Sequence, residues 1–109
     1  MGEYVQVQTS IPSREKGLEI ARSIIDAHLG ACAQVVGPML STYRWKGEVR
    51  VDEEYLLLVK TTAERYPDLE AHIRGMHSYS VAEIISVPIN SGLSSYLQWM
   101  DEETQAPGG

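Results

Sequence analysis

The chain has 109 residues, of which 43% are apolar and 22% charged, and this balance is typical of a globular domain rather than a disordered segment. Its formal net charge is −6, and its nine Lys and Arg residues are spread along the chain. This argues against nucleic-acid binding, because phosphate backbones are bound by clustered cations.

The first predicted elements are a strand and an amphipathic helix. Residues 4–9 alternate apolar and polar side chains, as a strand with one buried face does. Ser13 is the expected N-cap of the helix that follows, because its hydroxyl can accept a hydrogen bond from the first turn. Gly30 should end this helix. The side chains at helical spacing that should face the sheet are Leu18, Ala21, Ile25 and Leu29.

A long β-hairpin is predicted next. Its first strand covers residues 32–45, with a bulge at Gly37-Pro38, and Lys46-Gly47 turn the chain. The strand returns over residues 49–59, and its apolar run at 55–59 should be buried on both faces. Because such a hairpin extends beyond a small sheet, we expect a partner chain to cover it. The expected charged tip comprises Arg44, Lys46, Glu48, Arg50, Asp52, Glu53 and Glu54.

The remaining elements complete the fold. Thr62 is the expected cap of a second helix, which Gly75 should end. A strand over residues 83–89 and a short helix over 93–103 follow. This order predicts an α+β, ferredoxin-like βαββαβ sandwich with both helices on one face of an antiparallel sheet, a long hairpin and a short C-terminal helix. We expect one domain over residues 1–109, with 103–109 as a frayed tail.

Five segments along the chain resemble the CutA family of divalent-cation tolerance proteins in sequence, order and spacing. They are Gly30-Ala31-Cys32-Ala33, Tyr43-Arg44-Trp45-Lys46-Gly47, Glu53-Glu54 followed by Leu58-Val59-Lys60-Thr61, the run from His77 to Ile84, and Tyr96-Leu97-Gln98-Trp99. The resemblance covers about residues 4–102. It implies a ferredoxin-like protomer, a tight homotrimer joined through the long hairpins, and a link to copper and other divalent cations.

The chain departs from this family at four positions. Where the family usually reads His-Pro-Tyr-Glu-Val-Pro-Glu, this chain has Ser78, Ser80 and Ala82, so two prolines and a potential oxygen ligand are absent. Some members have a cysteine, proposed as a copper ligand, where this chain has Gln8. We therefore expect a less rigid loop and a smaller ligand set than the family pattern provides.

Three residues are candidate metal ligands. His77 and Glu83 offer an imidazole and a carboxylate, which suit copper, zinc or nickel, and Cys32 would be a soft thiolate ligand. The alternatives are structural. His77 can sit at a helix C-terminus, Glu83 can hydrogen-bond to the backbone or to a neighbouring chain, and Cys32 can be a buried apolar residue.

Aromatic side chains suggest either a ligand cleft or a subunit interface. Tyr79, Tyr96 and Trp99 could line a small-molecule pocket with Glu83 at its base, or they could anchor a neighbouring subunit. Tyr43 and Trp45 lie in the predicted hairpin. We expect these two residues to contact another protomer.

The predicted function is non-catalytic. The sequence contains no Gly-rich phosphate loop, no nucleophile elbow, and no Cys-x-x-Cys or His-Glu-x-x-His motif. We expect a trimeric divalent-cation tolerance protein that binds copper or another divalent ion. The alternative is a trimeric sensor of a small ligand, similar to the PII signalling proteins, or a protein-binding scaffold. A single cysteine, with neither a leader pattern nor a long apolar stretch, predicts a cytoplasmic protein without membrane insertion.

Overall fold

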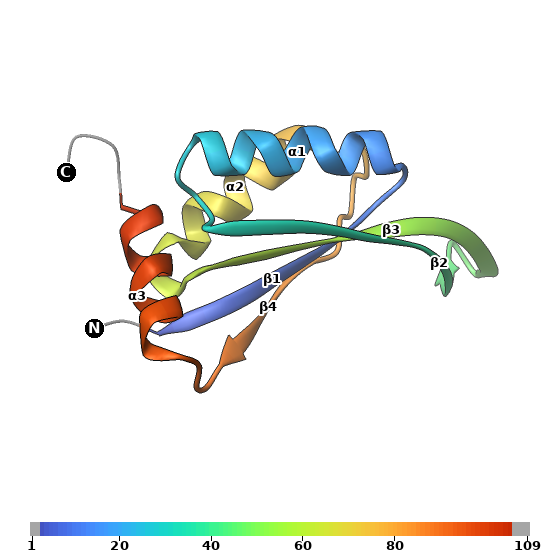
Figure 1. Cartoon of the computed structure of the whole chain (residues 1–109). Coiled ribbons are helices and arrows are strands. Elements are labelled where there is room, and N and C mark those ends of the chain that lie inside the picture. The colour runs from blue at the N-terminus through green and yellow to red at the C-terminus, as the bar shows by residue number, and fades with distance from the viewer. Residues whose placement is uncertain (1–2, 106–109) are drawn as a thin grey trace.

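A computed structural model describes residues 3–105 as a four-stranded antiparallel sheet with helices packed on it (Figure 1). The strands lie in the order β2-β3-β1-β4. This confirms the predicted ferredoxin-like architecture. The elements are β1 (Tyr4–Ile11), α1 (Arg14–Asp26), β2 (Cys32–Trp45), β3 (Glu48–Thr62), the 3-10 turn η1 (Ala63–Arg65), α2 (Tyr66–Met76), β4 (Ile84–Ile89) and α3 (Ser94–Glu103).

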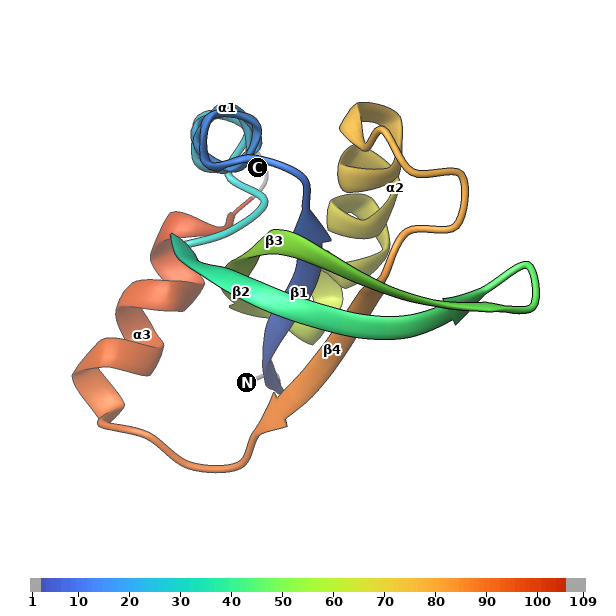
Figure 2. The same ribbon diagram turned by 90° about the vertical axis from the view of Figure 1, so that its right-hand side faces the viewer.

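The hydrophobic core lies between the sheet and the two helices α1 and α2, which cover the same face (Figure 2). Alternate residues of a strand point to opposite faces. In β1 and in the part of β3 that pairs with it, one set of alternate residues is therefore buried, and the other set lines the uncovered face. That face exposes Val36, Ile85 and Val87 by 42–51%. The fully buried side chains of this core cluster are Val7, Ile11, Ile20, Ile24, Leu57, Val59, Leu69 and Ile73.

The residues predicted to face the sheet from α1 are confirmed only in part, because Ala21 and Leu29 are buried. Ser13 does cap the helix, since its hydroxyl accepts a hydrogen bond from Lys16 N at 3.1 Å. Leu18 and Ile25, however, are 47% and 38% exposed. The buried helical residues are Gly17, Ile20, Ala21 and Ile24. Gly17 lets the helix approach the sheet so closely that an added Cβ would lie 3.2 Å from Val35. The buried stripe of α1 is therefore the one that includes Gly17, where the helix packs closely against Val35.

The end of α1 was also predicted wrongly. The helix stops at Asp26, and His28 adopts the left-handed conformation with a φ of 58°. The amides of His28 and Leu29 donate to Ile25 O and Ile24 O, which is the Schellman pattern. Gly30 has another role. A Cβ there would lie 2.5 Å from Val59, so this glycine allows the chain to pass close to β3.

The two strands of the β2–β3 hairpin are much longer than β1 and β4. The hairpin register shifts between Val36 and Met39, which confirms the predicted bulge. The prediction that residues 55–59 are buried on both faces is wrong, because Leu57 is fully buried whereas Leu56 is only half-buried. Glu54 does not belong to an exposed tip, since it is only 8% exposed.

The C-terminal part begins with the predicted cap and ends in an ordered turn. Thr62 Oγ1 accepts a hydrogen bond from Arg65 N at 3.3 Å and so caps η1, and α2 continues past Gly75 to Met76. Thr104, expected to fray, is 3% exposed and donates to Met100 O at 2.7 Å. The last part of the predicted tail, residues 106–109, lies outside the described residues. Among residues 3–105, no helix is long and apolar enough to cross a membrane.

Candidate functional site

A groove of about 770 Å³ lies between the β2–β3 hairpin and the segment that joins α2 to β4. We call it the hairpin groove. From the hairpin register, its residues Tyr43, Trp45, Arg50 and Glu54 share one face of the hairpin. The residues that define the groove are Ser10, Tyr43, Trp45, Glu54, Tyr79 and Glu83.

His77 and Glu83 each form a hydrogen bond with Ser10, near the end of β1. Ser10 Oγ donates to Glu83 Oε1 at 2.8 Å, and the Ser10 carbonyl lies 2.7 Å from His77 Nε2. His77 Nδ1 accepts a hydrogen bond from Tyr79 N at 3.1 Å, so the ring proton belongs on Nε2, which donates to Ser10 O. The backbone of His77 also ends α2, where its N–H donates to Ile73 O at 2.9 Å. The structure therefore brings the predicted imidazole and carboxylate to one residue.

Tyr79 links the same loop to the hairpin. Its hydroxyl donates to Glu54 Oε2 at 2.8 Å, and its ring lies 4.8 Å from the His77 ring. Burial, followed by the hydrogen bond to the Glu54 carboxylate, raises the pKa of Tyr79. Tyr43 makes a similar bond to Asp52, which raises the pKa of Tyr43. Both phenols thus stay protonated and act as hydrogen-bond donors to carboxylates.

The groove is acidic. The carboxylates of Glu54 and Glu83 line it, and Arg50 is the one basic residue among its lining residues. The Arg50 guanidinium is half exposed and lies 3.9 Å from Glu48, which is a weak surface pair. Such a charge distribution favours a cation over an anion.

Cys32 lies far from His77 and Glu83. Cys32 pairs with Lys60 of β3, whereas Ser10 pairs with Leu56. Four residues along a strand correspond to about 13 Å. Within residues 3–105, no group of three or more His, Cys, Asp or Glu side chains could hold a metal ion. The described part of one chain therefore does not contain a complete site made of these residue types.

Tyr96 and Trp99 also lie away from the hairpin groove. Both belong to α3, at the end of the sheet opposite the hairpin tip (Figure 1), and their rings are 5.4 Å apart. Burial, followed by the electrostatic interaction with Cys32, raises the pKa of Tyr96. Of the aromatic residues that we predicted with Glu83, the structure places only Tyr79 in the groove.

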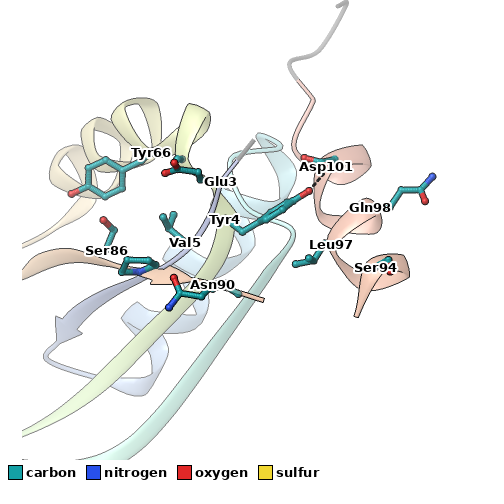
Figure 3. Close-up of a pocket in the computed structure, with 13 residues that line it drawn as sticks. Glu3, Tyr4, Val5, Tyr66, Ser86, Asn90, Ser94, Leu97, Gln98 and Asp101 are labelled. Carbon is teal, nitrogen blue, oxygen red and sulfur yellow. Dashed lines mark hydrogen bonds between the residues drawn. The ribbon is translucent and has the colours of Figure 1, made fainter. Parts of the chain in front are cut away.

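A second groove of about 960 Å³ runs between α3 and the beginning of β1 (Figure 3). Tyr4, on one wall, donates to Asp101 Oδ2 of α3 at 2.6 Å. Val5, Leu97 and Asn90 also line this groove. None of the candidate site residues from the sequence lies in it.

Sequence reasoning missed Ser10 and the site role of Glu54. Ser10 follows the predicted end of the first strand, and its partners are 67 and 73 residues away in the chain. Glu54 had a usable signal, because it shares strand parity with Leu56 and Leu58 and comes directly before an apolar run.

The chain matches the family model of the CutA1 divalent ion tolerance protein over residues 5–103. It is 42% identical to the divalent-cation tolerance protein CutA of Thermus thermophilus, over 90% of this chain and 95% of that protein. It is 36% identical to human protein CutA over 87% of this chain and 53% of the human protein.

Solved structures agree with these matches. A Thermus thermophilus structure of the divalent cation tolerance protein superposes with a TM-score of 0.91 at 40% identity, covering 94% of this chain and 99% of that one. The CutA1 structure from Oryza sativa gives a TM-score of 0.92 at 36% identity and covers 95% of both chains.

Proposed function

The chain belongs to the CutA1 divalent ion tolerance family, and from that premise we propose that it is a homotrimer that binds divalent metal ions, copper foremost, through His77 and Glu83 in the cellular response to metal ions. The observation that carries the proposal is the junction at Ser10, where both side chains are held by one residue. Imidazole nitrogen and carboxylate oxygen together suit Cu²⁺, Zn²⁺ and Ni²⁺.

The hydrogen bonds of His77 indicate which nitrogen would bind the ion. The contact of Nε2 with Ser10 O is short, at 2.7 Å, and holds the ring against β1. The Nδ1 contact with Tyr79 N is longer, at 3.1 Å, and its partner lies in the exposed loop. A metal ion would therefore replace the Tyr79 amide at Nδ1, while Nε2–H keeps the ring oriented.

Assembly would complete the ligand set and cover the hairpin. The hairpin exposes Leu40, Val49 and Val51 by 75%, 62% and 59%. β2 and β4 are the edges of the described sheet, and long apolar edges favour pairing with another chain. Tyr43 and Trp45, each 39% exposed, would contact the neighbouring protomer, and a group from that protomer would serve as a further ligand.

Isothermal titration with Cu²⁺ and Zn²⁺ tests the proposal. Wild-type protein should bind one ion per chain, and a His77→Ala/Glu83→Gln variant should lose at least about tenfold in affinity. His28→Gln is the matched control, because His28 lies just after the end of α1, with its Nδ1 3.2 Å from the Glu103 carbonyl, and its replacement should leave binding unchanged. Equal affinity of the double variant and the wild type would overturn the metal site.

A second function is favoured by the size of the hairpin groove. Its volume of about 770 Å³ is within the range of small-molecule sites. Its aromatic lining residues, Tyr43, Trp45 and Tyr79, are also typical of such sites. A PII-like sensor or a protein-binding scaffold would use this groove without metal. Stabilisation of the protein by metabolites but not by metal ions, measured by thermal shift, would favour this second function.

We also propose a non-catalytic role and a cytoplasmic location, as the sequence predicts. The relatives differ in compartment, because the Arabidopsis thaliana relative is named chloroplastic and the Archaeoglobus fulgidus structure is described as periplasmic. Fractionation of cells that express the native chain tests the location. Recovery in the periplasm or in an organelle would contradict it.

A further inference from the structure

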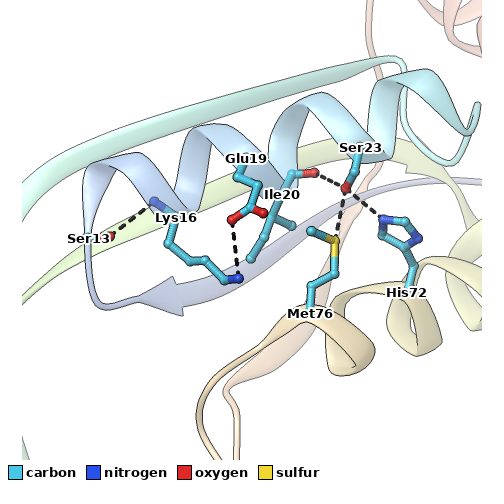
Figure 4. Close-up of polar contacts among 7 residues, drawn as sticks. All are labelled: Ser13, Lys16, Glu19, Ile20, Ser23, His72 and Met76. Atoms are coloured by element: carbon cyan, nitrogen blue, oxygen red, sulfur yellow. Dashed lines mark hydrogen bonds and ion pairs between the residues drawn. The ribbon is translucent and has the colours of Figure 1, made fainter.

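A second group of potential ligands lies between α1 and α2, away from the hairpin groove (Figure 4). Ser23 of α1 points at His72 and Met76, which are four residues apart and therefore on one side of α2. Ser23 Oγ lies 2.8 Å from His72 Nε2 and 3.1 Å from Met76 Sδ. All three residues are half-buried, so the cluster is within reach of solvent.

The Ser23 hydroxyl makes the polar contacts of this cluster. Ser23 Oγ also contacts the Ile20 carbonyl at 2.8 Å, so one hydroxyl hydrogen faces two acceptors, the carbonyl oxygen and the Met76 sulfur. A proton on His72 Nε2 would be donated to Ser23 and would not help either acceptor. The Ile20 carbonyl lies inside α1 and also accepts the helical backbone bond, whereas the Met76 sulfur is a weak acceptor that the hydroxyl leaves free when it donates to the carbonyl. The sulfur is therefore available as a ligand beside the His72 imidazole.

We propose that His72 and Met76 form a binding site for a soft monovalent metal ion, Cu(I), with Ser23 as a weak third ligand. A thioether is a soft ligand that selects Cu(I), and imidazole also suits copper. Hard ions such as Mg²⁺ and Ca²⁺ need several oxygen ligands, which this cluster lacks. Glu19, one turn before Ser23 on α1, is paired with Lys16 at 3.3 Å.

The geometry permits the site without rearrangement of the helices. An ion bonded to both atoms would hold them roughly 4 Å apart, given bonds of about 2.0 Å to nitrogen and about 2.3 Å to sulfur. Two atoms at 2.8 and 3.1 Å from one hydroxyl oxygen can take that separation. The ion would enter beside Ser23 Oγ, whose hydrogen would be donated to the Ile20 carbonyl while its oxygen faces the ion.

Titration with Ag(I), a redox-inert probe for Cu(I), tests the site. All proteins carry Cys32→Ser, because a thiol would bind Ag(I) itself. The Cys32→Ser protein should bind Ag(I), and His72→Gln and Met76→Leu should each weaken binding at least about tenfold. The matched controls, His28→Gln and Met39→Leu, should not change it. Unchanged affinity in the His72→Gln/Met76→Leu variant would overturn the proposal.

A second measurement does not depend on the variants. The chain has four Met residues, whose methyl groups can be followed separately by NMR. Ag(I) should shift the Met76 methyl and the His72 ring signals, while Met39 and Met100 stay in place. Shifts that leave Met76 unchanged would refute the site. The His77→Ala/Glu83→Gln variant should still bind Ag(I), so failure of this proposal and failure of the divalent site are distinguishable.

Discussion

Replacement of Tyr79 by Phe tests whether the loop after α2 is fastened to the hairpin as the structure shows. The substitution removes only the hydroxyl, which donates to Glu54 Oε2 at 2.8 Å. Glu54 is 8% exposed, so its carboxylate would lose this partner in a largely buried position. A hydrogen bond to a charged group contributes about 1.5–3 kcal/mol. Because Tyr79 is 37% exposed and water can reach the position, we expect a loss near 1.5 kcal/mol.

The assay is urea denaturation at a fixed chain concentration, since the stability of an assembly depends on concentration. Tyr66→Phe is the matched control. Tyr66 donates to Glu70 at 2.9 Å within α2, and a pair of this spacing on one helix contributes about 0.2–0.5 kcal/mol. The reasoning is refuted if Tyr79→Phe lowers the free energy of unfolding no more than Tyr66→Phe does.

Three further predictions concern stability. Gly30→Ala should cost about 1–3 kcal/mol in chemical denaturation, because its Cβ would lie 2.5 Å from the buried Val59, whereas Gly75→Ala, with nothing within 4 Å, should cost nothing; equal effects would contradict the packing argument. Ser13→Ala should cost about 1 kcal/mol through loss of the cap on α1, and an unchanged unfolding midpoint would exclude that role. The raised pKa of Tyr79 means that the unfolded chain loses this proton first, so its stabilising contribution is complete below about pH 10 and declines above it. Denaturation from pH 9 to 11 should show a smaller decline in Tyr79→Phe, and parallel declines would contradict the shift.

Local patterns were enough to predict the order of the elements. Alternation along β1, the hydroxyl of Ser13 before α1, and the Gly37-Pro38 interruption of the hairpin each specify a local conformation, and the structure has all three. These features depend on residues close together in the chain. They therefore needed no knowledge of tertiary packing.

Tertiary packing decided what the sequence left open. The apolar pattern of α1 allowed two faces, and the close approach of Gly17 to Val35 selected one of them. His28 has the left-handed conformation at the end of α1, where we had expected Gly30 to stop the helix, and Gly30 instead lies close to Val59.

The candidate site shows the same difference between what local sequence predicts and what tertiary packing decides. His77 and Glu83 were predicted from residue type, and in the structure each of them forms a hydrogen bond with Ser10. Ser10, which joins them, could not be found from local sequence, because it is 67 residues from His77. Cys32, with Tyr96 and Trp99, was grouped with the site by chemistry alone, and the strand register separates it from Ser10.

Native mass spectrometry of the purified chain after addition of Cu²⁺ tests the central claim most directly, because one spectrum gives both the assembly and its metal content. The account predicts a trimer of the 12.1 kDa chain that carries one copper ion per chain, and a metal-free trimer for His77→Ala/Glu83→Gln. A single chain, or a wild-type trimer that takes up no copper, would contradict it.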